Sequence, residues 1–511
     1  MCQVEEDYKD DLERAAVPSV SKKCVKCKEA TAAVVIRAGH SYCRGCFKEY
    51  FIHKFRAMLG KNRIIFPAEK VLLAVSGGPS SCSMLSLVQE GLSQSAHKKL
   101  RFLPGIVYID EGGATGQSAE ERQRTVAELQ AVFKATGLPF HIVPLEQVLD
   151  LPGSVLLTGP AASDQPAGAY KAAVDQFIQS DSSICLTQTE QEETSPPDVQ
   201  ESHTQLLQQL IGSVKTLTAK EDLLHTLRQH LLVHTARAEG YSKLMLGDSC
   251  TRLAVKLLTS VSLGRGAQLA QDTGFSDSRY GDITLVRPMR DYSSKDIAYY
   301  NHLFHVPSVF IPSLGTKTAD KASIQRLTEG FITRLQADFP HTVSAIYRTS
   351  EKLQTACKSS STAEHSDRCL FCMCALDTTV EDASAFNMTL ISEQLSQLKV
   401  SGNNIAEPST QNSPAEPESN APPGQCCSSG GGGEDCGRAA GGGGCCSSAQ
   451  LTEPPNLRSL LCYSCQLIIK DMSSVDHLPL YILSEAQRRK RRSQMREEIS
   501  EFLLDDGEDA D

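Results

Sequence analysis

Short apolar runs alternate with longer segments of helical periodicity through the centre of the chain, residues 67–310. An uninterrupted apolar run is typical of a strand buried on both faces, whereas apolar residues spaced three and four apart indicate an amphipathic helix. The predicted strands are Val71–Val75, Leu100–Tyr108, Pro139–Leu145, Lys243–Leu246 and Ile283–Val286, and the predicted helices are Met84–Leu92, Ala119–Thr136 and Ser294–Phe304. This alternation predicts an α/β fold with a doubly wound, mostly parallel sheet.

The first strand is followed by a turn of small residues. Ser76, Gly77 and Gly78 can bring backbone N–H groups close to an anion, and Ser80 or Ser81 can cap the next helix. The turn lacks the Gly-Lys-Ser/Thr ending of a Walker loop, and an ordinary strand-to-helix turn explains so short a match about as well. Ligands of such sheets bind beyond the carboxyl ends of the strands. The further candidate ligand contacts are therefore Asp110, Glu111, Gly247 and Asp248.

Cysteine pairs flank this central region. Near the N-terminus, Cys24 and Cys27 are followed fifteen residues later by Cys43 and Cys46. Two CxxC pairs at this separation supply four thiolates that can surround zinc, so we predict a structural zinc site. His40 could compete as a ligand, but we expect it to pack beside the site. A RING is excluded because it needs eight ligands, and the next seventy residues supply only one more cysteine.

A second set of cysteines is split by a long low-complexity segment. Cys369 and Cys372 precede the segment, and Cys462 and Cys465 follow it. The entropic cost of closing a loop grows slowly with its length, so the separation is no obstacle to a second shared zinc site. Cys374 is a spare ligand. The alternative is two pairs of buried thiols without metal.

Composition predicts five parts: an N-terminal zinc module with a basic helix (1–66), the α/β domain (67–310), a helical region with the first half of the C-terminal zinc site (311–395), a disordered linker (396–450), and the second half of that site with a charged tail helix (451–511). Within the α/β domain, residues 150–218 are rich in Ser, Gln, Thr and Pro. We predict that they form a low-complexity insertion.

The chain of 511 residues has a net charge of −10, so any nucleic-acid contact must use local patches. No apolar run reaches the ~20 residues that cross a bilayer. The acidic N-terminus is typical of neither a signal peptide nor a transit peptide. Because many of the 19 cysteines stand in CxxC pairs, we expect metal binding in a reducing cytosol and a cytoplasmic protein.

Two predicted helices carry local basic patches. The helix Phe47–Leu59 can bury its aromatic residues and expose its cations, which are predicted to contact RNA phosphates or, equally, to form a solvated face. The run Arg488–Arg492 is predicted as a solvated face, with a nuclear signal or an RNA contact as alternatives. The candidate phosphate contacts along the chain are Lys48, Lys54, Arg56, Arg252, Arg265 and Arg290.

The order of these features resembles a known family. A paired-CxxC module is followed by strand–SGG–helix, by IDEG after the second strand, by LGD after the fourth, by RPMRDYSSKDI after the fifth, and by a late paired-cysteine site. The chain is similar to the ATP-pyrophosphatase loop family, whose fold is adenine-nucleotide α-hydrolase-like. Within that family it resembles the group that thiolates the wobble uridine of tRNA at C2.

The resemblance implies a specific chemistry and specific partners. ATP adenylates the C2 carbonyl oxygen of uridine 34, and AMP leaves as sulfur from a thiocarboxylated ubiquitin-like carrier replaces that oxygen. Loop N–H groups and Mg²⁺ would stabilise the departing pyrophosphate. The implied partners are tRNA, the sulfur carrier and a paralogous catalytic subunit in a heterodimer, and protein urmylation is an associated process.

Three positions depart from the pattern of catalytic members. Those members carry SGGxDS, and Ser80 stands in place of their aspartate. Their CxxC pair before the fourth strand corresponds to His225–Arg228, and their third cysteine falls near His305–Val309, which contains none. An iron–sulfur cluster or a persulfide therefore has no thiols here. Cys250 and Cys82 are the remaining candidate nucleophiles, although a lone helical cysteine is more often a small buried hydrophobe.

We therefore predict a non-catalytic partner of an active thiolase subunit, which helps to hold tRNA and contains two structural zinc sites. One alternative is a chain that is itself an ATP-dependent tRNA sulfurtransferase and tolerates Ser80. A second is a zinc-stapled interaction scaffold without an RNA role.

Overall fold

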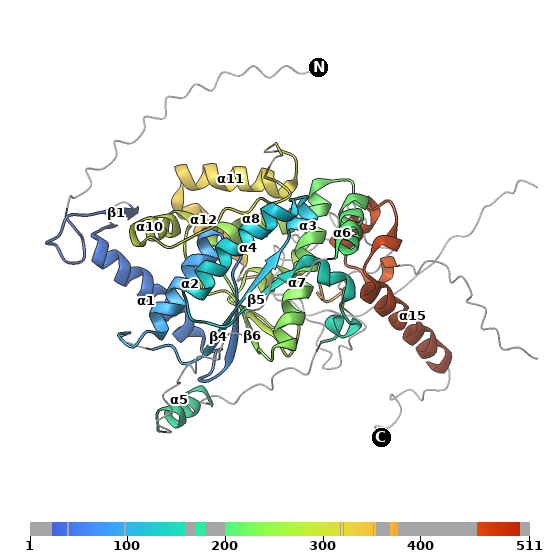
Figure 1. Cartoon of the computed structure of the whole chain (residues 1–511), viewed down its shortest axis with the longest axis horizontal. Helices are drawn as coiled ribbons and strands as arrows, with labels where there is room; N and C mark the ends of the chain where they lie inside the picture. Colours follow the sequence, from blue (N-terminus) through green and yellow to red (C-terminus); the bar gives the residue numbers. More distant parts are fainter. Residues whose placement is uncertain are drawn as a thin grey trace, which may run out of the picture. The chain divides into compact units, whose positions relative to one another are not determined.

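The computed structural model describes most of the chain outside its terminal and low-complexity segments (Figure 1). The described residues are 23–37, 40–96, 99–158, 169–179, 200–316, 318–319, 321–350, 352–353, 368–376 and 457–500. The predicted linker, residues 396–450, lies outside them. None of the helices in these ranges is both long and apolar enough to cross a membrane.

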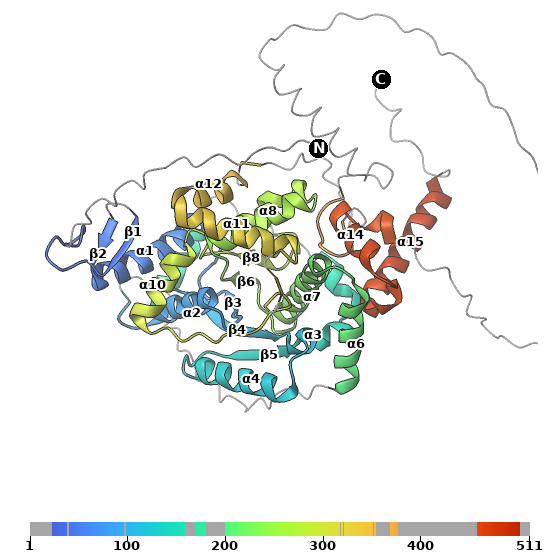
Figure 2. The ribbon, with the colours of Figure 1, turned by 90° about the horizontal axis from the view of Figure 1, so that it is seen from above.

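A six-stranded sheet forms the centre of the α/β domain (Figure 2). The strand order is β5-β4-β3-β6-β8-β7, and every neighbouring pair is parallel except β7 with β8. The strands are β3 (Lys70–Ala74), β4 (Leu103–Asp110), β5 (Phe140–Pro144), β6 (Lys243–Leu246), β7 (Ser276–Asp277) and β8 (Thr284–Val286). The predicted α/β class is confirmed. The antiparallel edge strand β7 was not predicted, because two polar residues carry no periodic signal.

The sheet separates two hydrophobic cores. Successive side chains of a strand point to opposite faces, and in β3 Val71 and Leu73 belong to one core while Leu72 belongs to the other. The helices that follow the strands are α2 (Pro79–Leu92), α3 (Gly112–Thr115), α4 (Ala119–Lys134), α7 (Leu217–Ala238), α8 (Cys250–Ser262), α9 (Leu269–Thr273) and α10 (Ser294–Phe304). Beyond them, α11 (Ile324–Asp338) and α12 (Pro340–Ser350) pack on α8 in a third, smaller core.

The predicted insertion, residues 150–218, contains folded segments. It contains the short 3-10 helix η2 (Gly153–Leu156) and the helices α5 (Ala169–Gln179) and α6 (Glu201–Ser213), and it follows η1 (Leu145–Asp150). In α6, Leu207, Leu210 and Ile211 are buried in the core beside α7. Their spacing of three and four residues stands among Gln, Ser and Thr, and that polar composition hid the helical period.

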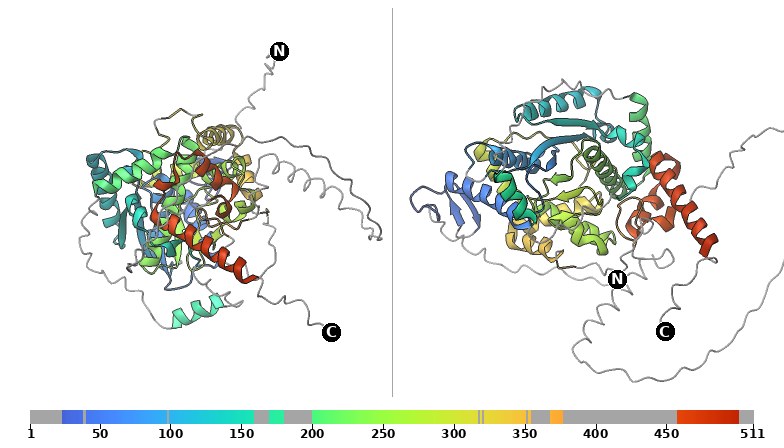
Figure 3. Two further views of the ribbon diagram at one scale, coloured as in Figure 1. Left: turned by 90° about the vertical axis from the view of Figure 1, so that its right-hand side faces the viewer. Right: turned by 90° about the horizontal axis from the view of Figure 1, so that it is seen from below.

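The two terminal modules share cores with the α/β domain. Strands β1 (Val34–Arg37) and β2 (His40–Tyr42) precede α1 (Arg44–Asn62), whose Phe47, Phe51 and Phe55 are fully buried. Phe51 stacks on Tyr300 of α10 at 4.1 Å between ring centroids. The C-terminal segments η5 (Leu457–Leu460), α14 (Tyr463–Asp471), η6 (Val475–His477) and α15 (Leu480–Ser500) lie beside the helices of the opposite face (Figure 3).

Candidate functional site

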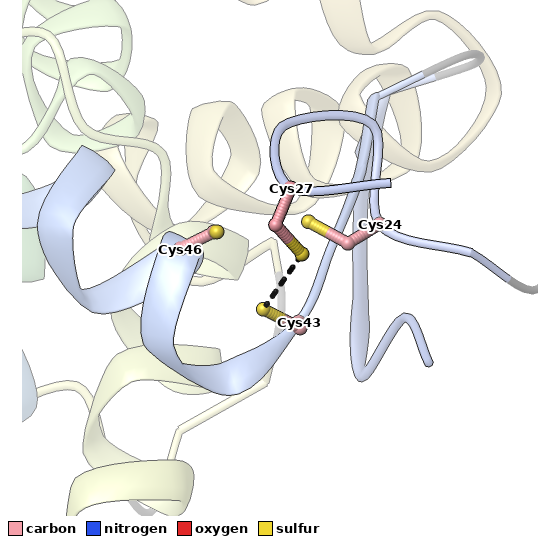
Figure 4. A group of neighbouring side chains, drawn as sticks. All are labelled: Cys24, Cys27, Cys43 and Cys46. Atoms are coloured by element: carbon pink, nitrogen blue, oxygen red, sulfur yellow. Dashed lines mark hydrogen bonds between the residues drawn. The ribbon is translucent and has the colours of Figure 1, made fainter. Parts of the chain in front are cut away.

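The N-terminal module brings four cysteines together as predicted (Figure 4). Cys24 and Cys27 come from the turn before β1, and Cys43 and Cys46 come from the start of α1. All four sulfur atoms lie within 4.8 Å of one another, and those of Cys27 and Cys43 are 3.9 Å apart. Tetrahedral zinc with Zn–S bonds of about 2.3 Å separates its sulfurs by about 3.8 Å. The donor set therefore fits zinc, and His40 is not part of it.

Without a bound ion, the pKa values of two thiols in this centre shift in opposite directions. Burial alone raises the pKa of Cys24, but backbone hydrogen bonds led by that from Cys43 outweigh burial and lower it to about 6. Burial and hydrogen bonds to the other sulfurs raise the pKa of Cys46 to about 12. A bound divalent cation removes this conflict, because it stabilises all four thiolates at once.

The C-terminal centre joins its two cysteine pairs across the low-complexity segment. The sulfurs of Cys369, Cys372, Cys462 and Cys465 lie within 4.8 Å of one another, and those of Cys372 and Cys462 are 3.6 Å apart. Cys369 and Cys465 are fully buried. The four-thiol donor set again fits zinc. Iron and other thiophilic metals also prefer thiolate ligands, so the donor set alone does not distinguish them.

Cys374, the predicted spare ligand, lies outside this four-sulfur group. Its sulfur accepts a hydrogen bond of 3.0 Å from Arg279, whose guanidinium also pairs with Asp272 and Asp277. Because Arg279 donates to the carbonyl oxygen of Cys372 as well, at 3.3 Å, it ties the four-cysteine group to the edge of the sheet.

A buried histidine links the same centre to α7. His230 bonds the Tyr481 hydroxyl of α15 through Nδ1 and the Phe371 carbonyl oxygen through Nε2, both at 2.7 Å. Burial lowers the pKa of His230 to about 4, so the imidazole is neutral at pH 7. Sequence reasoning missed this residue, because nothing in the spacing of HTLRQHLLVH marks which histidine faces the core.

The SGG turn lies at the point where the strand order reverses, between β3 and β6, which is where ligands of such sheets bind. Gly77 has φ +76°, which favours glycine. Gly247 follows β6, and a Cβ atom there would lie 2.9 Å from Ser81 Cα, so only glycine allows this approach. The structure therefore brings Gly247 to the turn as predicted.

The polar groups around the turn are committed to protein partners. The hydroxyl of Ser80 donates to the Gly247 carbonyl oxygen, and those of Ser76 and Ser81 are 3.3 Å apart. Val309 N donates to the Gly77 carbonyl oxygen at 2.9 Å, which holds the segment after α10 across the loop.

The carboxylates predicted to face a ligand each pair with an arginine. Asp110 accepts from Arg122 at 2.8 Å, and Asp248 lies 3.4 Å from Arg287 Nε. Glu111 makes a bidentate pair with Arg228. Sequence reasoning missed these pairs, because their partners are distant in the chain and no local pattern marks them.

The two candidate nucleophiles are buried in cores. Cys82 is 3% exposed and donates to the Gly77 carbonyl oxygen at 3.2 Å, and Cys250 is 4% exposed. Burial raises the pKa of both thiols to about 11, so neither is a thiolate at neutral pH. This environment favours the alternative of small buried hydrophobes, because an activated cysteine needs a lowered pKa and access.

The predicted phosphate contacts fall into two groups. Arg265 pairs with Asp222, and Arg290 is 7% exposed with a hydrogen bond to the Thr273 carbonyl oxygen, so neither presents a surface charge for RNA. In the accessible group, Arg252 is exposed on α8, whereas Lys48 lies 3.6 Å from Glu90 and Lys54 lies 3.8 Å from Asp296. Arg56 borders a hollow beside α1.

Comparisons with known proteins bear on the whole chain. A structure of the U34-tRNA thiolase NcsA from Methanococcus maripaludis with its [4Fe-4S] cluster is 15% identical, covers 66% of this chain and 90% of its own, and has a TM-score of 0.44, a likeness too distant to carry an argument. The family model described as cytoplasmic tRNA 2-thiolation protein 2 matches residues 323–467.

Curated relatives with the same description match from end to end. The protein of Danio rerio is 54% identical over 100% of both chains, and that of Homo sapiens is 50% identical over 100% of this chain and 99% of its own. Identity at this level over the full length shows common family membership. The chain therefore belongs to the cytoplasmic tRNA 2-thiolation protein 2 family.

Proposed function

We propose that this chain is the non-catalytic subunit of a cytoplasmic enzyme that thiolates wobble uridine 34 of tRNA at C2. An active sister subunit would adenylate the uridine and receive sulfur from a thiocarboxylated ubiquitin-like carrier. Family membership along the whole chain supports the thiolation role. The pair between Arg228 and Glu111 is the observation that carries the non-catalytic role.

This pair stands at the position where the resemblance places a cluster thiol. The second cysteine of the CxxC in catalytic members corresponds to Arg228 on α7, and its guanidinium spans both oxygens of Glu111, the first residue after Asp110 of β4. A neutralised ion pair offers no thiolate to iron or to a sulfur donor. The position that would carry sulfur chemistry is therefore filled by a structural contact.

The loop does not fit Mg²⁺–ATP hydrolysis either. Mg²⁺ takes oxygen ligands in near-octahedral geometry and is usually held by one or two carboxylates. Asp110 and Asp248 both face arginines, and a hydroxyl at position 80 replaces the carboxylate of the family motif. We therefore propose no adenylation step through this loop, whose turn is retained as part of the fold.

Zinc in the two cysteine centres would act as a cross-link and not as a reaction centre. Four thiolates close the coordination sphere, so no position remains for substrate. In the N-terminal module zinc would fix the start of α1, and in the C-terminal centre it would hold α14 to the Cys369–Cys374 segment. Exposed cations such as Arg252 remain proposed tRNA contacts.

Reconstitution separates this proposal from the enzymatic alternative. The purified chain is expected to release no pyrophosphate from ATP with tRNA and carrier, and to support thiolation only after the sister subunit is added. Thiolated tRNA is measured by its retardation in an organomercurial gel. Ser80→Ala and Cys250→Ala are expected to leave the rate unchanged, because neither side chain faces a reacting group.

Two results contradict the proposal. Pyrophosphate release by the chain alone, abolished by Ser80→Ala, would establish an independent sulfurtransferase. The second result has two parts: this chain and the sister subunit together fail to bind tRNA, and thiolation proceeds unchanged when this chain is omitted. That result would leave only the scaffold alternative.

A further inference from the structure

A hollow of about 220 Å³ lies beside α1. Six of its lining residues matter to what it can bind: the cations Arg56, Lys99 and Arg101 and the aromatic residues Phe66, Phe102 and Tyr170. Its volume is below the roughly 300–1,000 Å³ of sites for drug-sized ligands. It is therefore limited to a single nucleotide at most, and a dinucleotide does not fit.

The hollow is remote from the SGG turn. Arg101 and Phe102 directly precede β4, and Pro67 precedes β3, so the hollow lies at the amino ends of the central strands. The turn follows the carboxyl end of β3. Five residues of strand at about 3.3 Å each put these two edges about 16 Å apart.

Two of its walls are fixed by backbone hydrogen bonds. Phe66 N donates to the Glu69 carboxylate at 2.7 Å, and Ala68 N donates to the Arg101 carbonyl oxygen at 2.6 Å. Leu100 N donates to the Gly91 carbonyl oxygen at 2.8 Å, which anchors the segment that carries Lys99 and Arg101. The backbone segments that carry Phe66, Lys99 and Arg101 are therefore fixed before any ligand arrives.

Helix α5 supplies the fourth wall. Tyr170, Ala173, Val174 and Phe177 are half-buried at a helical spacing, whereas Lys171 and neighbouring residues are exposed. The Tyr170 ring meets Phe66 edge-on, at 5.5 Å between centroids and 65° between planes. Two rings at this angle leave aromatic faces available for a flat ligand.

The charges of the hollow lack counterions among the described residues. Within that part of the chain, Arg56, Lys99 and Arg101 take part in no ion pair, and the Nε atom of Arg56 is buried without a hydrogen-bond acceptor. A buried donor without a partner is costly. An anion in the hollow would pair with the positive charges of Arg56, Lys99 and Arg101.

Cations beside aromatic faces suit the two parts of a nucleotide. Aromatic side chains stack on any base, and guanidinium groups pair with phosphate. We propose that the hollow binds one unpaired nucleotide of the tRNA substrate, with its base against the rings and its phosphate against the guanidinium groups. The inference rests on the proposed function for the identity of the RNA. It adds a second contact, remote from the wobble base.

The chain contains no tryptophan, which permits a direct test. Tyr170→Trp places a single reporter in the hollow, and its fluorescence is expected to be quenched when single-stranded oligouridylate is added to the full chain. Phe339→Trp, at a position 63% exposed on a distant helix end, serves as the control and is expected to stay unquenched. Equal quenching at both positions would overturn the inference.

Affinity for full-length tRNA is the second readout. Tyr170→Ala is expected to weaken binding about tenfold, since a base stack is worth about that factor, and Tyr170→Phe is expected to keep wild-type affinity. Arg101→Ala is expected to weaken binding and to lower the slope of log affinity against log salt by about one. Arg124→Ala, an exposed arginine of α4, is the matched control and is expected to change the affinity little.

The outcomes separate this inference from the proposed function. If the Tyr170→Ala and Arg101→Ala variants both bind tRNA as tightly as wild type, the inference is wrong and the proposed function stands. If the oligouridylate quenches the reporter but the assembled pair thiolates no tRNA, the hollow binds RNA and the proposed function fails. Equal quenching by uridine monophosphate at the same concentration would show a free-nucleotide site and overturn the RNA assignment.

Discussion

The two four-cysteine centres have the same ligands but opposite relations to the rest of the fold. In the N-terminal centre the ligands come from one short stretch, and three of the four cysteines are half-exposed. In the C-terminal centre the two pairs are separated by 90 residues, and the ligands belong to a core that also contains α6 and α7. The first centre, the N-terminal clasp, joins residues of one local segment, whereas the second joins distant segments of the chain within a hydrophobic core.

Two centres with the same four ligands can therefore contribute differently to stability. The neighbours of each centre decide this contribution. The N-terminal centre has an exposed Lys26–Glu49 pair beside it. The C-terminal centre has His230 and Arg279, both buried and both bonded to other elements.

Removing one ligand from each centre gives the largest expected contrast. Cys465→Ser is expected to unfold the chain or leave a state without a cooperative transition, because zinc centres contribute on the order of 10 kcal/mol to small domains. Cys46→Ser is expected to release one zinc and to leave the main melting transition in place. Calorimetry and zinc content measure both effects, with Cys250→Ala as a control thiol outside either centre. Equal changes in the melting transition of Cys465→Ser and Cys46→Ser would contradict the proposed difference between the two centres.

Arg279→Ala is expected to destabilise the chain by about 3–5 kcal/mol, because it leaves buried charges without their partner. Asp277 is 2% exposed and Asp272 is 8% exposed, and both pair with Arg279. Urea unfolding at pH 7 measures the change. Arg279→Lys keeps the positive charge but not the planar guanidinium that binds two groups at once, so it is expected to recover only part of the lost stability. A loss below about 1 kcal/mol would refute the assigned link between the sheet edge and the centre.

His230→Ala is expected to cost about 2–4 kcal/mol, from the cavity and from two partners left without hydrogen bonds. His230→Gln, which can still donate and accept, is expected to cost less. The free energy of unfolding of both variants is compared by urea titration. His234, four residues further along α7, is the matched control position, because no hydrogen bond among the described residues ties it to the C-terminal centre. Equal losses at both histidines would contradict a specific role.

Lys26→Ala is expected to have the smallest effect, about 0–1 kcal/mol, because its pair with Glu49 is exposed on both sides. The measurement is the same urea titration at low and high salt. A loss as large as that of Arg279→Ala would show that the N-terminal clasp is as tightly coupled to the fold as the C-terminal centre.

The sequence predicted the features that local patterns encode. The uninterrupted apolar run at Val71–Val75 and the CxxC spacings needed no tertiary information, so the central strand and both sulfur groups were predicted. Helix α6 was missed because its apolar residues are diluted by polar ones. Within the site, Arg228 and Glu111 are 117 residues apart, and their pairing depends on how α7 packs beside β4. The periodicity of apolar residues along the sequence does not reveal such pairs.

The hollow beside α1 shows the same limit. Its residues come from α1, from the segments before β3 and β4, and from α5, which are far apart in the chain. Sequence reasoning singled out Arg56 from the basic helix alone. Tyr170 lies in a stretch predicted as low-complexity, so its ring could not be assigned to the same surface.

The wide separation of the C-terminal ligands also sets the timing of folding during synthesis. At roughly 5–20 residues per second, the ribosome needs roughly 5–20 s to pass from the first cysteine pair to the second. Throughout that interval the apolar side of α7 has no C-terminal cover, because Leu461, Ile468 and Tyr481 have yet to emerge. The nascent chain therefore exposes this apolar side of α7 until the C-terminal segment has been made.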